Sequence, residues 1–287
     1  MQRPSLRLLI ELAAAAVTGA ATLLAFRRCN RDEAIVSLRC EIRDALLLIR
    51  RDNGGPIAHP PAVLVTGFRA NGKSSFVNTA CRALADEVGP LLLRVETAPP
   101  GSRPATIARR AVRAAVAAEE GEAAVELLDA PALPEAVRLT RADVEAALVG
   151  GGGGGEAAPV AECVVLVLRC GGPAKERNLA VRKLPDIAGA VRERGLNLVV
   201  VLTHKKAIKT IQQAEELRRE VAFRARTDCV YFIENYTSSS MLNIRHPGII
   251  KNSFETHFTV LAIIRQCIEF SKSYRSHSSR EISINKN

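Results

Sequence analysis

The chain has 287 residues, of which 47% are hydrophobic, so it can bury a sizeable core and does not have the composition of a disordered protein. Its net charge of +10 suits an anionic partner, but only 4% of residues are aromatic and Trp is absent, which argues against nucleic-acid binding through base stacking. The seven cysteines form no CxxC pair and no metal-ligand spacing with His, which is typical of reduced thiols in a cytoplasmic or cytosol-facing protein.

The first predicted element is the apolar stretch 8–26, inside an N-terminal segment 1–29. Arginines bracket the stretch, and Glu11 is its only charge. Its length just reaches across a bilayer, yet about half of its residues are Ala, Thr or Gly, which insert weakly. Two interpretations follow. The stretch is either a membrane anchor that leaves the rest of the chain facing the cytosol, or a buried or transit-type helix.

An amphipathic helix is predicted next, within residues 30–57. Its apolar residues recur at intervals of three and four with charges between them, and we expect this face to dock on the main domain. They are Ile35, Leu38, Ile42, Ala45 or Leu46, and Ile49. The Gly- and Pro-rich residues that follow end the helical pattern, so the main domain is predicted to begin at residue 58.

From residue 58 to 270, apolar runs alternate with helical patterns. The runs are continuous, which is typical of parallel strands buried on both faces. The predicted fold is therefore α/β with three layers: a mostly parallel sheet with helices on both faces, preceded by N-terminal helices. After a first strand that begins at residue 62, the predicted strands are 91–96, 123–129, 163–169, 196–203 and 229–235, and the predicted helices include 74–88, 174–194 and 208–226.

Two segments have a biased composition. The six glycines 150–155 are of low complexity and predict a flexible surface insertion. They do not have the context of a phosphate loop, because no strand precedes them and no lysine follows. Residues 271–287 are polar, Ser-rich and basic, which predicts a disordered tail.

The most specific motif is GFRANGKS at residues 67–74, which matches G-x-x-x-x-G-K-[ST] between a strand and a helix. Glycines there let backbone N–H groups turn inward around a β-phosphate. Lys73 would reach the β- and γ-phosphates, and the Ser74 hydroxyl would ligate Mg²⁺. The alternative is a glycine turn with a chance lysine. The expected phosphate-binding residues are Gly67, Asn71, Gly72, Lys73, Ser74 and Ser75.

Two more residues are predicted to complete a Mg²⁺ site. Asp129 directly follows an apolar run, at the carboxyl edge of the sheet, and would hold Mg²⁺ through water; alternatively it caps a helix that starts at Pro134. A threonine ahead of the second strand is also expected, and we prefer Thr106 to Thr97 because it precedes an alternating β-like stretch. The same region is basic, with Arg103, Arg109, Arg110 and Arg113. We interpret these residues as a solvated strand face; alternatively, one of them stabilises transferred phosphate charge.

The segments GFRANGKSS, LLDAPAL and VLTHKKA occur in the order and at the approximate spacing of the GTPase signature elements. Over residues 58–270 the chain resembles a divergent G-domain protein, and it is similar to plant P-loop nucleoside triphosphate hydrolases related to interferon-induced GTP-binding-like proteins. The resemblance implies a GTP or GDP ligand with Mg²⁺, although ATP stays open. It places base-binding loops at Thr203 and His204, whose ring would pack over the base or be an ordinary loop histidine. Glu234 or Asn235 would accept hydrogen bonds from guanine.

Three positions depart from the GTPase pattern. Ala132 replaces the glycine that contacts the γ-phosphate, and Leu133 stands where many GTPases have a water-orienting Gln. Lys206 replaces an aspartate that accepts from guanine. We therefore expect a nucleotide-dependent switch with slow hydrolysis, or one that borrows a catalytic group from a protein partner. The alternatives are a non-hydrolysing membrane-tethered scaffold and an ATP-binding small-molecule kinase.

Overall fold

The structure, a computed structural model, describes residues 6–52, 59–97, 106–117, 123–150, 159–237 and 250–284. The predicted Gly-rich insertion lies outside these ranges from residue 151 onward.

A six-stranded sheet forms the centre of the molecule, in the order β2-β3-β1-β4-β5-β6. Only the β2–β3 pair is antiparallel, and the other neighbours are parallel. The mostly parallel α/β fold is therefore confirmed. The strands are β1 (Ala62–Gly67), β2 (Arg110–Ala115), β3 (Ala124–Asp129), β4 (Cys163–Arg169), β5 (Asn197–Thr203) and β6 (Val230–Phe232).

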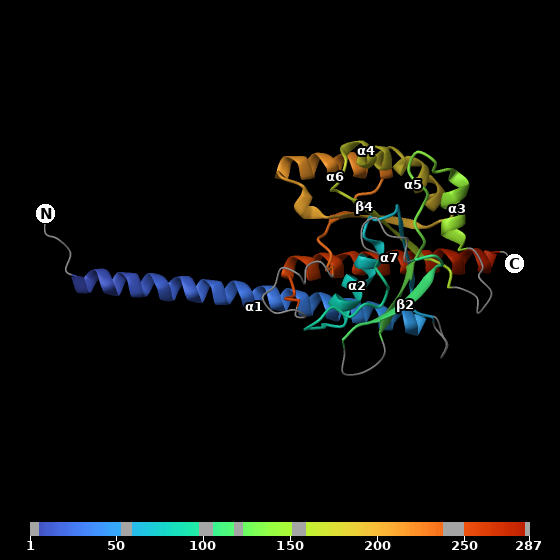
Figure 1. Cartoon of the computed structure of the whole chain (residues 1–287). Helices are drawn as coiled ribbons and strands as arrows, with labels where there is room; N and C mark the ends of the chain where they lie inside the picture. Colours follow the sequence, from blue (N-terminus) through green and yellow to red (C-terminus); the bar gives the residue numbers. More distant parts are fainter. Residues whose placement is uncertain are drawn as a thin grey trace.

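Helices cover both faces of this sheet and make the three predicted layers (Figure 1). In β1, Val63 and Val65 face one helical layer, whereas Leu64 faces the other. This burial on two sides explains why the strands read as continuous apolar runs. One face is covered by α2 (Lys73–Leu84), α7 (Phe254–Ile284) and part of α1 (Leu6–Asp52). The other is covered by α3 (Arg141–Val149), α4 (Ala174–Arg182), α5 (Leu184–Glu193) and α6 (Ile211–Ala225), and a short 3₁₀ helix, η1 (Lys205–Ala207), follows β5.

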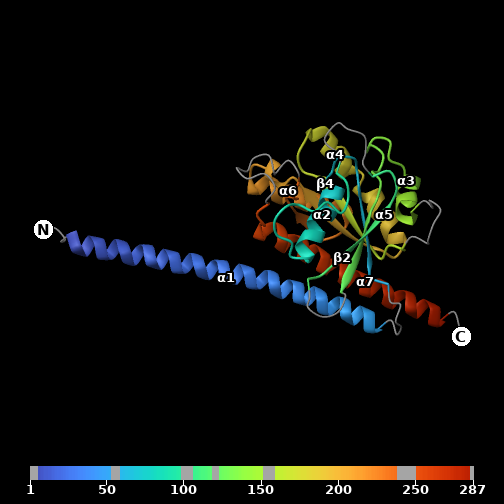
Figure 2. The ribbon, with the colours of Figure 1, turned by 60° about the horizontal axis from the view of Figure 1, so that its bottom comes forward.

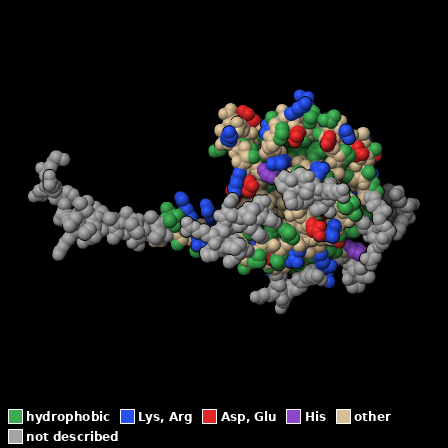
Figure 3. Space-filling model, in the orientation of Figure 1, with side chains coloured by type: hydrophobic (Ala, Val, Ile, Leu, Met, Phe, Trp, Pro, Cys, Tyr) green, Lys and Arg blue, Asp and Glu red, His purple; other side chains and the backbone are tan. Residues whose placement is uncertain are grey.

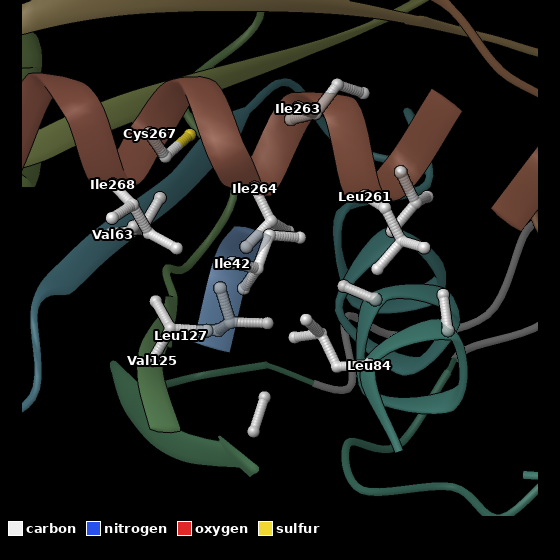
Figure 4. Close-up of a cluster of buried hydrophobic side chains, with 14 of the residues drawn as sticks. Ile42, Val63, Leu84, Val125, Leu127, Leu261, Ile263, Ile264, Cys267 and Ile268 are labelled. Carbon is white, nitrogen blue, oxygen red and sulfur yellow. The ribbon is translucent and has the colours of Figure 1, made fainter. Parts of the chain in front are cut away.

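Helix α1 is one continuous helix of 47 residues that joins the predicted segments 1–29 and 30–57. Its predicted apolar face is buried from Ile35 to Ile49, so the docking of this helix on the main domain is confirmed. Figure 4 draws Ile42 of α1 beside Leu127 of β3 and Ile264 of α7.

The N-terminal half of α1 extends away from the body of the molecule (Figures 1 and 2). Within its described side chains, Leu23, Leu24 and Phe26 are exposed. Across the described part of the chain, no helix combines the length and apolar character needed to cross a membrane.

The predicted strand at 91–96 is wrong. This segment has no strand structure, and part of its backbone is hydrogen-bonded to the side chain of Asn78 on α2 instead. The Asn78 Oδ1 atom accepts hydrogen bonds from the N–H groups of Arg94 and Val95 at 2.8 and 2.9 Å, and its Nδ2 donates to the Val95 carbonyl at 2.9 Å. The Asn78 side chain thus makes hydrogen bonds of the kind that a neighbouring strand would make.

The predicted helix 174–194 divides at Lys183 into α4 and α5. Pro185 lies in the first turn of α5, where its missing N–H is harmless, but it cannot continue a preceding helix.

The prediction of a disordered tail from residue 271 is wrong for residues 271–284. Helix α7 continues through them, and Ser271 is fully buried. Arg275 donates two hydrogen bonds to the Glu162 carboxylate, at 2.6 and 2.8 Å, which ties this part of α7 to the start of β4. Polar composition alone does not reveal such a pairing across 113 residues.

Candidate functional site

The loop between β1 and α2 has a backbone that depends on its glycines. Gly67 has φ +145°, and a Cβ atom there would lie 2.3 Å from the Val167 carbonyl oxygen, so only glycine permits this approach of β1 to β4. Gly72, with φ +85°, precedes the first turn of α2. The loop therefore opens onto the N-terminal end of a helix, in the arrangement that a phosphate-binding loop requires.

Lys73 directs a buried ammonium group into this loop. Its Nζ atom donates to the Phe68 carbonyl at 3.1 Å, and the residue is 7% exposed. Burial lowers the pKa of Lys73 to about 8, and the nearby Asp129 carboxylate acts in the opposite direction. An ammonium group has three donors, so it retains donors for an anion.

Three oxygen-bearing side chains meet beside this lysine. The Oδ2 atom of Asp129 accepts hydrogen bonds from the hydroxyls of Ser74, at 2.9 Å, and Thr106, at 3.0 Å. The two hydroxyl oxygens are 3.3 Å apart. Burial raises the pKa of Asp129, whereas these hydrogen bonds and Lys73 oppose that rise. The structure thus brings together the three residues that the sequence predicts for Mg²⁺.

The second carboxylate oxygen of Asp129, Oδ1, is buried and has no hydrogen-bond partner among the described residues. Such an atom is costly to bury unless a water molecule or a cation satisfies it. Nor does Asp129 cap a helix at Pro134: the next helix is α3, which begins at Arg141 and is capped by Thr140 and Asp143. The donor set therefore fits Mg²⁺, which is typically bound by one or two carboxylates together with phosphate oxygens and water.

No cluster of three His, Cys, Asp or Glu side chains is placed for a metal within the described ranges. A site made of hydroxyls and one carboxylate requires none.

Two of the predicted base-contacting residues hold the phosphate loop itself. The Thr203 hydroxyl donates to the Asn71 carbonyl at 2.8 Å, and Asn235 Nδ2 donates to the Gly72 carbonyl at 3.2 Å. The Asn235 Oδ1 atom is buried without a partner among the described residues. His204 adopts φ +58°, and its Nδ1 atom lies 3.0 Å from the Thr203 hydroxyl oxygen.

Glu234 contacts position 206, where this chain has a lysine in place of the aspartate of the GTPase pattern. Its Oε2 atom accepts a hydrogen bond from the backbone N–H of Lys206 at 3.0 Å. A carboxylate from the loop after β6 therefore lies against residue 206, where the GTPase pattern has an aspartate. The two candidate acceptors for guanine have different contacts: Asn235 Nδ2 donates to the Gly72 carbonyl, and Glu234 accepts from the Lys206 N–H.

Leu133 is buried beside the phosphate loop, next to Phe68. Its backbone N–H donates to the Gly67 carbonyl at 3.0 Å, while its side chain is 5% exposed and belongs to the core. A cavity of about 800 Å³ lies next to this contact, between loop residues 68–71, residues 132–137 and α4. Leu133 itself offers no polar group where many GTPases have a Gln.

One arginine from the basic stretch differs from its prediction. Arg109 is half-buried rather than solvated, because its guanidinium donates to backbone carbonyls of α3. Nothing in the sequence marks this contact, since the partners lie 38 and 39 residues away.

The sequence matches no protein-family model and no curated protein. Among solved structures it is similar to Toc33 from Arabidopsis thaliana in complex with GDP and Mg²⁺, with 14% identity, a TM-score of 0.48, and coverage of 83% of this chain and 93% of that chain. The complex of Toc33 with Mg²⁺ and GMPPNP gives 13% identity and a TM-score of 0.47 at the same coverage. The signal recognition particle receptor SRb-GTP/SRX complex from Chaetomium thermophilum gives 12% identity and a TM-score of 0.38, over 61% of this chain and 89% of that chain. Likeness at this level does not show the function of this chain.

Proposed function

We propose that the chain binds a guanine nucleotide together with Mg²⁺ and acts as a nucleotide-dependent switch that hydrolyses GTP slowly. The observation that carries this proposal is the meeting of the buried Lys73 ammonium with the oxygens of Ser74, Thr106 and Asp129 at the mouth of a glycine-dependent loop. The unpartnered Oδ1 atom of Asp129 supports it, because Mg²⁺ held through water would satisfy that atom.

Glu234 supports guanine rather than adenine. The Watson–Crick edge of guanine presents the N1–H and N2–H donors, and a carboxylate accepts both. Adenine presents an acceptor at N1, which would face the carboxylate without a proton between them. A site built to accept hydrogen bonds rejects a ligand that cannot donate them.

Leu133 supports slow hydrolysis. With its side chain in the core, this position offers no group to orient an attacking water molecule. Hydrolysis at an appreciable rate would then need a group from a protein partner.

The test is a titration of the full chain with GTP, GDP, ATP and ADP, each with Mg²⁺ and with a chelator. We expect guanine nucleotides to bind at least about tenfold more tightly than adenine nucleotides, and Mg²⁺ to strengthen triphosphate binding. Glu234→Gln should reduce the guanine preference, whereas the exposed Glu215→Gln on α6 should not. A clear preference for ATP would contradict the guanine proposal and favour a kinase, and a chain that binds none of the four would contradict nucleotide binding altogether.

The exposed part of α1 favours a second proposal, attachment of the protein to an anionic membrane surface. Leu24 and Phe26 are 66% and 63% exposed, and Arg27 and Arg28 follow them directly. Figure 3 shows hydrophobic and basic side chains next to one another where α1 leaves the body. Helices of this composition lie in the interface of bilayers that contain anionic lipids. The test compares vesicle binding by the full chain with that of a chain lacking residues 1–29.

A further inference from the structure

Arg109 links the loop that carries Thr106, which precedes β2, to the C-terminal end of α3. Its Nη2 atom donates to the carbonyls of Ala147 and Leu148, the latter at 3.2 Å. Both carbonyls belong to the last turn of α3, where backbone acceptors have no partner within the helix. A cation at the carboxyl end of a helix also interacts favourably with the helix dipole.

Gly150 leaves the space that this contact needs. It follows α3 directly, with φ +78°, and a Cβ atom there would lie 2.5 Å from Arg109 Nη1 and 2.6 Å from Cζ. Any other residue would press on the guanidinium. The contact of Arg109 with α3 therefore depends also on a glycine at position 150, 41 residues away in the sequence.

The contact of Arg109 with α3 fixes one end of the short loop 106–109, and Thr106 lies at the other end of this loop. Residues 106–109 have no regular secondary structure, and β2 begins only at Arg110. Yet the Thr106 hydroxyl lies 3.0 Å from the Asp129 carboxylate and 3.3 Å from the Ser74 hydroxyl. A loop without ladder hydrogen bonds needs another restraint to hold a side chain at such distances.

We infer that Arg109 is a positioning residue for the Mg²⁺ site: by fastening the 106–109 loop to the end of α3, it holds the Thr106 hydroxyl where it ligates the ion. The inference rests on the proposed function. Because coupling between sites is reciprocal, Mg²⁺ binding also restrains the end of α3.

The test measures the affinity of the full chain for GTP with saturating Mg²⁺ and with a chelator, so that the gain due to Mg²⁺ is obtained separately. For Arg109→Ala we expect this gain to shrink about tenfold, the usual effect of losing a charge-assisted hydrogen bond, while affinity in the chelator stays within about twofold. Arg109→Lys should recover part of the gain, because an ammonium keeps the charge but not the fork of donors. The exposed Arg219→Ala on α6 is the matched control and should behave as the unaltered chain.

Gly150→Ala provides a second, independent route to the same contact. Alone it should reduce the Mg²⁺ gain in the same direction as Arg109→Ala, and in the double variant it should add little, because both changes remove one contact.

Three results would overturn the inference. A Mg²⁺ gain unchanged in Arg109→Ala would show that the contact does not act on the ion. An equal loss of affinity with Mg²⁺ and with the chelator would show a general structural role. If the unaltered chain binds no nucleotide, the proposed function fails and the inference fails with it, an outcome distinct from the other two.

Discussion

Lys73 holds its charge in a place with little access to water, and this makes its protonation part of ligand binding. Among the described residues, the Lys73 ammonium has the Phe68 carbonyl as its hydrogen-bond partner and the Asp129 carboxylate as a nearby opposite charge. Its lowered pKa, about 8, means that the group is mostly charged at pH 7 and mostly neutral at pH 9. Phosphate binding requires the charged form.

We therefore expect nucleotide affinity to fall about tenfold between pH 7 and pH 9. Above the pKa of the free protein, binding must include uptake of a proton, and each further pH unit removes about nine-tenths of the charged form. The measurement is the dissociation constant of GDP with Mg²⁺ across this range. Lys73→Arg, which stays protonated, should show a flat profile over the same range. A steep profile in that variant would assign the effect to another group.

Some residues of the site can be predicted from the sequence alone, and others cannot. The phosphate loop and Asp129 follow from local pattern, because the loop motif and the end of a buried strand are both visible in a few consecutive letters. The contacts of Glu234 with Lys206 and of Arg109 with α3 depend on side chains reaching between segments distant in the sequence. No local pattern marks them, since propensity and periodicity describe only near neighbours.

At the scale of elements, helix α7 shows most clearly that amino-acid composition does not predict packing: its C-terminal part is polar and yet helical. Its apolar residues lie in the core against α1 and the sheet, and the helix then continues through a polar stretch. That stretch stays in place through Arg275 and Glu162, whose side chains are 18% and 11% exposed. Composition also fails to reveal the structure of residues 91–96, where the Asn78 side chain, and not a neighbouring strand, is hydrogen-bonded to the backbone. Strands β3, β4 and β5 were predictable because their burial on both faces gives continuous apolar runs.

Arg275→Ala should lower the free energy of unfolding by about 3 kcal/mol, because it leaves a largely buried carboxylate without its charged partner. Chemical denaturation at pH 7 measures this loss. The control is Arg265→Ala, whose ion pair with Glu41 is half-exposed on both sides and should cost less than about 1 kcal/mol. Equal losses in the two variants would contradict a structural role for the end of α7.

At the scale of the whole molecule, α1 has two parts with different environments. Residues from Ile35 onward complete the core beside α7, whereas the described side chains before them are largely exposed. The sequence predicts the packed part because its apolar residues recur at helical spacing. It does not predict that both parts form a single helix, because the composition changes near residue 30 while the backbone stays helical.

Deleting residues 1–29 should leave the melting temperature within a few degrees of the full chain and abolish binding to anionic vesicles. Deleting residues 1–52 should prevent folding to a soluble protein, because it uncovers the partners of Ile42, Leu46 and Ile49. Thermal unfolding and vesicle co-sedimentation measure the two effects. Vesicle binding that survives the shorter deletion would contradict the membrane proposal.

The extended first half of α1 also determines how the protein moves through solution. A straight helix adds about 1.5 Å of length per residue, so residues 6–33 extend the particle by about 40 Å while adding little mass. Friction with the solvent follows shape as well as mass, and a 30.9 kDa chain of this form diffuses more slowly than a sphere of the same mass. A single copy will therefore elute early from a sizing column. The number of copies in solution must then be measured by light scattering, which reports mass independently of shape.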